Sequence, residues 1–369
     1  MANILELCTS PDKGGLELYF ADISNKLSKT FNTVRVLGPK SSLADFLNQD
    51  IPEFIIEKKS HYLPFKAAKK LAKIIDDNSI DLLHLHWNKD LALAVFAKRF
   101  SKRKPKVVLT RQMQFPGKKN GIYHRFIYKQ VDHIIAITKT LENDMRANIP
   151  LSVQPELSTI YYGVKSLEKA NKEVTQKLRH EYVDEDDDFL IGLFGRIDAY
   201  KGQHLLIKAI KLAHGKSYPF KAVIVGHAME DSYLEELKEL VASLKMEKYI
   251  IFTGFVNNPR ELMQACDTVV LTTVEETFGL VLIEAMSVGI PVIGSNRGGV
   301  PEIIEHKQSG LLFESESVAS LLDNLETMYH NKKIRLRCIE NGEIKAKETF
   351  NYEQHIKNVS QLLEKILKS

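Results

Sequence analysis

Two glutamates, Glu276 and Glu284, are separated by seven residues in the stretch VEETFGLVLIEAMSVGIPVIGS. The run before them, DTVVLTTV, is rich in β-branched residues, and Gly279 to Val288 has the composition of a short helix that ends before Pro291. The pattern predicts a strand, a loop that carries Glu276 and a helix that carries Glu284.

The start of that helix is the predicted chemical site. Free backbone amides around Gly279 and Leu280 are expected at the carboxyl end of a strand, where helix N-termini bind phosphate. Glu284 lies about 7 Å further along the helix axis at about 1.5 Å per residue, close to the separation of a diphosphate from its ribose. A carboxylate there can accept hydrogen bonds from both ribose hydroxyl groups. Glu276 would face the group on the other side of the diphosphate.

Strand-like and helix-like segments alternate along the whole chain. Periodic segments such as Leu16 to Lys29 and Pro64 to Asn78 separate the short apolar runs ILELC, TVRVLG, LLHLHW, KVVLT and HIIAIT. The alternation restarts at Phe189 and continues through KAVIVG, YIIFTGF, TVVLTT and IPVIGS. This order predicts α/β architecture with two doubly wound halves of parallel strands, joined by a polar connector before Phe189.

Length and composition agree with a two-domain enzyme. A chain of 369 residues exceeds what one hydrophobic core usually supports, and 44% hydrophobic with 27% charged residues is ordinary for a globular protein. Cys8, Cys266 and Cys338 are far apart in the sequence, which disfavours a disulfide framework or a zinc ribbon and fits a reducing cytosol. The start MANILELC predicts no secretory signal, and no run of about 18 apolar residues predicts a membrane span.

Positive charge is concentrated in one part of the chain. Between Ser60 and Gln130 there are sixteen Lys or Arg and four acidic residues, a local net of +12 against +4 for the whole chain. One interpretation is a solvated, lysine-rich surface. The other is a patch that meets anionic lipid headgroups, because NGIYHRFIY interleaves aromatic and basic residues. Nucleic acid is not the expected partner, since no nucleic-acid-binding motif accompanies the charge.

The sequence resembles glycosyltransferase family 4 over most of its length. The resemblance is carried by ETFGLVLIE, which has the family's two glutamates at the family's spacing, and by AMSVGIPVI, GGVPEII and SGLLF. It implies the GT-B fold, in which two Rossmann-like doubly wound domains face a central cleft. Residues 1–164 would bind the acceptor, with a helix at about 351–369 packing back on them, and residues 165–350 would bind a nucleotide-sugar donor.

The resemblance also implies roles for individual residues. In GRIDAYKGQHLLIKAI, Arg196 and Lys201 would hold the donor diphosphate and stabilise the charge that develops as it leaves, so neither a metal nor another cofactor is expected. Glu276 would orient the donor sugar, which completes the catalytic set with Arg196 and Lys201. FTGFVNNPRELMQACD resembles the segment that lies against the nucleobase, and CTSPDKGGLELYFADI has paired glycines that permit close approach of a ligand. The expected nucleotide-binding residues are Gly14, Gly15, Phe255, Val256, Phe278, Gly279, Leu280 and Glu284.

The first half of the chain departs from the family pattern. Many relatives carry a histidine in the loop after the fifth strand, whereas Arg111 and Gln112 occupy it here, so the general base is left open. His84 and His86 end an earlier strand, and we expect satisfied core or rim histidines rather than a base. Relatives often place asparagine where Tyr162 stands. A D-x-D spacing at 184–188 could bind a metal, but it precedes a strand, so a solvated turn is expected.

The implied reaction is transfer of a sugar from a nucleoside diphosphate sugar, with retention of anomeric configuration, to a glycan acceptor. The acceptor could be lipid-linked or of lipopolysaccharide type, and the enzyme would then be cytoplasmic and peripheral to the inner face of the membrane. The alternatives are a GT-B sugar-nucleotide epimerase or hydrolase and a non-catalytic nucleotide-binding scaffold.

Overall fold

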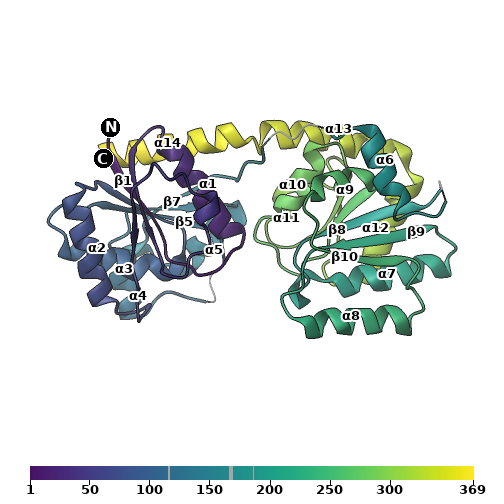
Figure 1. Cartoon of the computed structure of the whole chain (residues 1–369), viewed down its shortest axis with the longest axis horizontal. Helices are drawn as coiled ribbons and strands as arrows, with labels where there is room; N and C mark the ends of the chain where they lie inside the picture. Colours follow the sequence, from purple (N-terminus) through teal and green to yellow (C-terminus); the bar gives the residue numbers. More distant parts are fainter. Residues whose placement is uncertain (115–116, 166–168, 186) are drawn as a thin grey trace. The chain divides into compact units, whose positions relative to one another are not determined.

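The computed structural model describes residues 1–114, 117–165, 169–185 and 187–369. The chain forms two compact units, the first from Met1–Tyr161 with Glu353–Ser369 and the second from Tyr162–Tyr352 (Figure 1). The chain divides between Tyr161 and Tyr162 and again between Tyr352 and Glu353. The domain bounds and roles given by the resemblance stay predictions.

The first unit is built on a parallel sheet with the strand order β3-β2-β1-β4-β5-β6-β7. The order reverses between β1 and β4, which is the point where ligands bind in open α/β sheets. Its strands are β1 (Asn3–Cys8), β2 (Asn32–Leu37), β3 (Glu53–Ile55), β4 (Leu82–Leu85), β5 (Lys106–Arg111), β6 (His133–Ala136) and β7 (Glu156–Thr159). Its α-helices are α1 (Gly15–Leu27), α2 (Phe65–Asp77), α3 (Leu91–Phe100), α4 (Ile122–Tyr128), α5 (Lys139–Asn148) and α14 (Tyr352–Lys368).

The second unit has a parallel sheet with the order β10-β9-β8-β11-β12-β13, which reverses between β8 and β11. Its strands are β8 (Phe189–Phe194), β9 (Phe220–Val225), β10 (Ile250–Gly254), β11 (Thr268–Leu271), β12 (Val292–Ser295) and β13 (Leu311–Phe313). Its α-helices are α6 (Lys172–His180), α7 (Gln203–Gly215), α8 (Asp231–Ser243), α9 (Pro259–Ala265), α10 (Leu280–Ser287), α11 (Val300–Ile303), α12 (Val318–His330) and α13 (Lys332–Glu348). The short 3-10 helices of the two units are η1 (Ala44–Phe46), η2 (Asn88–Asp90), η3 (Leu151–Val153) and η4 (Ala199–Lys201).

Two parallel sheets confirm the predicted α/β architecture with two doubly wound halves. The apolar runs read from the sequence form strands, and β8 and β9 are buried along their whole length because helices cover a parallel sheet on both faces. The short edge strands β3 and β7 escaped the sequence analysis because they are only partly buried and carry no continuous apolar run. None of the described helices combines the length and the apolar character needed to cross a lipid bilayer.

The turn at 184–188 lies before β8, as the sequence indicated. Lys221 on β9 forms ion pairs with Asp184 and Asp188, the second at 3.2 Å, and Asp188 accepts hydrogen bonds from the backbone of Asp184 and Glu185. These carboxylates are thus held by a lysine at the amino-terminal edge of the sheet. Residue 186 lies outside the described residues.

The last helix, α14, belongs to the first unit although almost two hundred residues of the second unit precede it. Val359, Leu363 and Ile366 form one face of α14 and share a buried cluster with Ile4 of β1 and Ile23 of α1. This cluster makes the end of the chain part of the core that supports β1.

Leu363→Ala is expected to destabilise the first unit by about 2 to 5 kcal/mol, the range for a buried leucine cut back to alanine. Leu363 is fully buried, whereas Gln361 on the same helix is exposed, so Gln361→Ala is the matched control. Urea unfolding followed by fluorescence reports on this unit, because the single tryptophan, Trp87, lies in it. Equal midpoints for the two variants would contradict the packing role of α14.

Candidate active site

The second unit positions its candidate site at the point where the strand order reverses. Gly202 has a φ of +70°, and a Cβ there would lie 2.3 Å from the carbonyl oxygen of Thr272, just past β11. The Thr272 hydroxyl donates to the carbonyl oxygen of Lys201 at 2.8 Å. Because the backbone after β8 is packed against the backbone after β11, Lys201 is held at the carboxyl ends of both strands.

Lys201 and Glu276 form an ion pair, with 2.8 Å between Nζ and Oε2. The two side chains are 27% and 17% exposed, so the pair is partly shielded from water. The backbone of Glu276 is fixed as well, because the Gly299 amide donates to its carbonyl at 2.8 Å. Gly298, at a φ of +60°, leaves no space for a side chain, since a Cβ would lie 2.0 Å from that carbonyl oxygen. The structure thus brings two of the three predicted catalytic residues into contact.

Arg196, the third predicted catalytic residue, follows β8 and is exposed. Its Nη1 atom lies 3.6 Å from the sulfur of Met229, and its carbonyl oxygen accepts a hydrogen bond from the buried side chain of Gln203 at 2.9 Å. The backbone of Arg196 is therefore fixed at the same sheet edge as Lys201, while its guanidinium group lies toward solvent.

The predicted phosphate-binding terminus is the start of α10. Gly279 caps the helix with a φ of +104°, a backbone conformation that side chains rarely adopt, and Leu280 is the exposed first residue. Phe278 is buried, with its ring 5.5 Å from that of Tyr162 and 5.8 Å from that of Phe350. Phe278 therefore offers only backbone to a ligand, and its side chain anchors the helix start in the core of the unit.

Glu284 lies on α10 and is partly buried. Burial raises the pKa of its carboxyl group, and the charge of Arg260 opposes the rise. Among the described residues, no hydrogen bond or ion pair reaches its carboxylate, which leaves both oxygens available to a ligand.

The remaining predicted nucleotide-binding residues lie in both units. Phe255, just after β10, is 73% exposed, and Val256 is half-buried beside it. Phe255 is thus a surface ring rather than a core residue. In the first unit, Gly14 caps α1 and its amide donates to the Glu17 carboxylate at 2.9 Å, whereas no atom lies within 4 Å of a Cβ placed on Gly15. The start of α1 at Gly15 leaves space for a close approach of a ligand.

A second polar site lies in the first unit, at the carboxyl ends of β4 and β5. A cavity of about 420 Å³ is lined there by His86, Arg111 and Gln112, among others. Arg111 is 4% exposed, and burial lowers its pKa to about 10. Arg111 and Gln112, which occupy the loop where many relatives carry a histidine, therefore do form part of a ligand-sized cavity.

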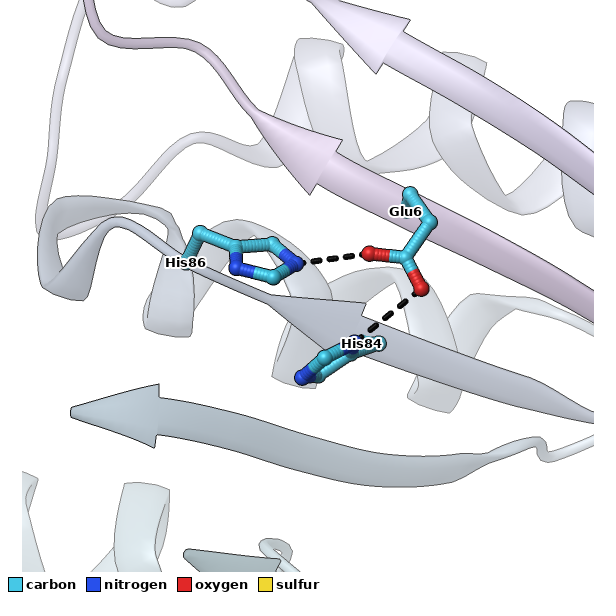
Figure 2. A group of neighbouring side chains, drawn as sticks. All are labelled: Glu6, His84 and His86. Carbon is cyan, nitrogen blue, oxygen red and sulfur yellow. Dashed lines mark hydrogen bonds and ion pairs between the residues drawn. The ribbon is translucent and has the colours of Figure 1, made fainter. Parts of the chain in front are cut away.

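Sequence analysis missed one residue beside this cavity. Glu6 on β1 is fully buried, and Figure 2 shows one of its carboxylate oxygens directed to each of two imidazole rings. The oxygens lie 3.0 Å from His84 Nδ1 and 2.6 Å from His86 Nε2. A single carboxylate inside the apolar run ILELC was the available signal, because a buried strand does not keep an unpaired charge.

The electrostatics of this group favour an ionised Glu6 beside a neutral His86. Burial by itself raises the pKa of Glu6, but the charge and hydrogen bonds of His84 together with those of His86 outweigh burial and lower it to about 2. Burial also lowers the pKa of His86 to about 4. His84 is satisfied on both sides, since its Nε2 lies 2.8 Å from the Thr110 hydroxyl. His84 is the core histidine that the sequence indicated.

Two protein families match the chain. Residues 13–166 match the family described as Glycosyltransferase Family 4, and residues 174–345 match the family described as Glycosyl transferases group 1. An N-acetyl-alpha-D-glucosaminyl L-malate synthase of Bacillus anthracis is 24% identical over 97% of this chain and 96% of its own length.

Further similarity extends over nearly the whole chain. A relative from Campylobacter jejuni is 26% identical over 90% of this chain and 92% of its own length. It is named N-acetylgalactosamine-N,N'-diacetylbacillosaminyl-diphospho-undecaprenol 4-alpha-N-acetylgalactosaminyltransferase. The crystal structure of Anabaena HepE in complex with UDP is similar with a TM-score of 0.85 and 23% identity, covering 99% of this chain and 100% of HepE. At that identity the likeness establishes a shared fold.

Glu284→Ala is expected to weaken binding of a nucleoside diphosphate, tested with UDP and GDP, by about 1.5 to 3 kcal/mol, the scale of hydrogen bonds to a charged group. Glu276→Ala should not weaken binding of the bare nucleotide, because Glu276 is predicted to face the sugar and not the nucleotide. Calorimetry can measure both, with Glu275→Ala as an exposed neighbouring control. Equal losses for the two variants with the bare nucleotide would contradict this division of roles.

Proposed function

We propose that this chain, which belongs to glycosyltransferase family 4, transfers a sugar from a nucleoside diphosphate sugar to a hydroxyl group of a glycan or glycolipid, with retention of anomeric configuration. The observation that carries the proposal is the 2.8 Å pair of Lys201 and Glu276 at the carboxyl edge of the second sheet. A cation beside a carboxylate provides adjacent positions for an anionic diphosphate and for the hydroxyl groups of the sugar attached to it.

The donor is bound by the edge of the second unit. Backbone amides at the start of α10 and the cations Arg196 and Lys201 bind the diphosphate, and Glu284 accepts hydrogen bonds from the ribose. Phe255 offers an exposed ring to the nucleobase. Glu276 accepts hydrogen bonds from the donor sugar and, by its contact with Lys201, ties the position of the sugar to that of the diphosphate.

The reaction exchanges one bond of the anomeric carbon for another on the same face. The bond from that carbon to the diphosphate oxygen breaks, a bond to the acceptor oxygen forms, and the hydroxyl proton moves to the leaving diphosphate. No enzyme carboxylate acts as a nucleophile. Lys201 and Arg196 stabilise the negative charge that grows on the leaving group, which is the role that a metal ion would otherwise have.

A panel of sugar nucleotides and glycan acceptors, assayed in EDTA, tests the proposal. We expect transfer without added metal, and we expect Lys201→Ala to lower kcat by about 10²- to 10³-fold, the range for loss of one preorganised group that stabilises developing charge. Lys208→Ala, an exposed change on α7, should have no effect. Activity that EDTA abolishes and magnesium restores would contradict the metal-free mechanism.

The same panel separates the alternatives. Isomerised or hydrolysed sugar nucleotide without an acceptor product would identify an epimerase or hydrolase. Binding of nucleotide without any turnover would identify a scaffold. Either result would overturn the transferase reaction proposed for this chain.

A peripheral position on an anionic membrane is part of the proposal. Lys66, Lys69, Lys70 and Lys73 are all exposed on α2, whose opposite face is buried, and the exposed ring of Phe65 starts that helix. Each such charge near an anionic surface contributes about 1 kcal/mol, so a few give reversible binding. The Campylobacter jejuni relative is named for an acceptor on diphospho-undecaprenol, which supports a lipid-linked acceptor.

Binding to phosphatidylglycerol vesicles is expected to fall with added salt, since exposed charges are screened within about 8 Å at physiological ionic strength. Charge reversal at Lys66, Lys69 and Lys70 should abolish sedimentation with the vesicles. The control reverses Lys208, Lys211 and Lys248, three exposed lysines of the second unit, and should sediment like the wild type. Equal binding to neutral and anionic vesicles, or no binding to either, would contradict a membrane role for α2. Its lysines would then form an ordinary solvated surface.

A further inference from the structure

Exposed apolar side chains gather where the segment 56–64 joins β3 to α2. Tyr62 and Leu63 in this segment are 69% and 54% exposed, and Phe65, which starts α2, is 46% exposed. Ile122, the first residue of α4, is 90% exposed. Single apolar side chains are common on protein surfaces, whereas a group of them marks a surface that another molecule covers.

Ring contacts join these residues into one surface. The Tyr123 hydroxyl donates to the carbonyl oxygen of Tyr62 at 2.6 Å, and the centres of the two rings are 6.0 Å apart. Ile122 directly precedes Tyr123, so its exposed side chain starts the helix that contacts Tyr62. The ring of Phe65 lies 4.9 Å from the buried ring of Phe96. We call the surface formed by Tyr62, Leu63, Phe65 and Ile122 the apolar patch.

The backbone beneath the apolar patch is fixed. The Ser60 hydroxyl oxygen accepts hydrogen bonds from the amides of Tyr62 and Leu63, both at 3.2 Å. The side chain of Lys58 is only 5% exposed, forms an ion pair with Asp90 and donates to the carbonyl oxygen of Lys89 at 2.8 Å. The apolar side chains are therefore exposed on a segment that is tied to the core of the unit.

Cations lie directly beside the apolar patch. A cavity of about 180 Å³ between the segment and α2 is lined by Leu63 and Phe65 together with Lys59, Lys66 and Lys70. Glu57 is the only carboxylate among the described residues that line it. Three lysines against one acid favour an anionic group, and lysine binds phosphate as a point charge. Apolar side chains and cations at one edge are what the interface of an anionic membrane requires.

The same segment contacts the wall of the cavity of about 420 Å³ in the first unit. Lys58 Nζ lies 4.4 Å from the centre of the Trp87 ring, and the ring of His61 meets it edge-on at 5.5 Å. Trp87 lines that cavity, and Tyr62 of the apolar patch directly follows His61. The apolar patch and the cavity wall are thus held by one fixed segment.

We infer that the apolar patch inserts into the interface of an anionic bilayer, with lipid phosphate groups bound by Lys59, Lys66 and Lys70. The inference rests on the membrane attachment in the proposed function and adds its depth and orientation. The lysines of α2 attract the surface, whereas insertion buries apolar area and fixes how the first unit faces the lipid. A lipid-linked acceptor then reaches the cavity beside Trp87 from the bilayer.

A second copy of this chain is the competing occupant of the apolar patch. Such a contact would bring the lysines around the patch on one copy against those on the other, and like charges that face each other oppose association. An anionic bilayer neutralises the same lysines. Charge complementarity therefore favours the bilayer.

A fluorescent label tests insertion directly. Cys8, Cys266 and Cys338 are all buried, so an environment-sensitive dye attaches selectively to the Ile122→Cys variant. On phosphatidylglycerol vesicles we expect a blue shift of its emission and quenching by lipids that carry a spin label near the headgroup end of the acyl chain. The same dye on Leu212→Cys, at an exposed leucine of α7, should show neither. A dye at position 122 that stays in water while the protein sediments with the vesicles would overturn insertion and leave the attachment by α2 standing.

Leu63→Ser combined with Ile122→Ser removes apolar area without changing any charge. We expect the affinity for phosphatidylglycerol vesicles to fall at least about tenfold, because interfacial binding scales with the buried apolar area. The slope of affinity against salt concentration should not change. Leu212→Ser combined with Leu336→Ser, at two exposed leucines of the second unit, is the matched control and should bind like the wild type.

Two results with these variants would overturn the inference. One is an affinity for the vesicles that is unchanged when Leu63 and Ile122 are replaced. The other is a wild-type dimer, seen by sedimentation velocity, that the same replacement converts to a monomer, because the apolar patch would then be the contact between two copies.

The vesicle measurements need no sugar, so the proposals fail separately. Insertion as described, together with no transfer from any sugar nucleotide, would overturn the proposed reaction and leave the apolar patch assigned to the membrane. Transfer to an acceptor embedded in vesicles at the wild-type rate by the variant with both serines would overturn the delivery of the acceptor from the bilayer and leave the transferase standing.

Discussion

Parallel sheets covered on both faces allow polar side chains to gather in few places, and this constraint shapes both units. Strand interiors such as β8 are buried at every residue, so charged groups collect where the strands end and loops begin. At the reversal of strand order the loops diverge, which opens space between them. Lys201 and Glu276 in the second unit and His86 with Arg111 in the first all lie at such an edge.

The two edges differ in how they balance charge. In the second unit the cation and the carboxylate neutralise each other directly, and an anionic ligand would compete with Glu276 for Lys201. In the first unit the carboxylates of Asp90 and Glu6 lie in buried contacts with Lys58 and with two histidines. The edge of the second unit thus places a cation beside a carboxylate, as the proposed nucleotide-sugar donor requires.

Glu6 is an exception, because this charged residue lies within a strand and not at a strand end. Burying its carboxylate there costs free energy. A carboxylate in the middle of a covered sheet is tolerated only when both of its oxygens accept hydrogen bonds. His84 on the adjacent strand β4 and His86, which follows that strand, contact one oxygen each. The two contacts of Glu6 fix the geometry of the cluster.

The sequence by itself determined the α/β class and the two doubly wound halves and carried the resemblance to glycosyltransferase family 4, because these depend on local apolar periodicity and on motifs contiguous in the chain. It placed the start of α10 at Gly279, since a glycine before a short apolar helix is a local signal. It did not reveal the contact of Lys201 with Glu276, or that Phe278 is a core ring and Phe255 a surface ring. It also gave no sign that Glu6 lies against His84 and His86. Those facts were decided by the tertiary structure alone, because strand pairing brings together residues more than seventy positions apart, and neither burial nor partners can be read from one segment.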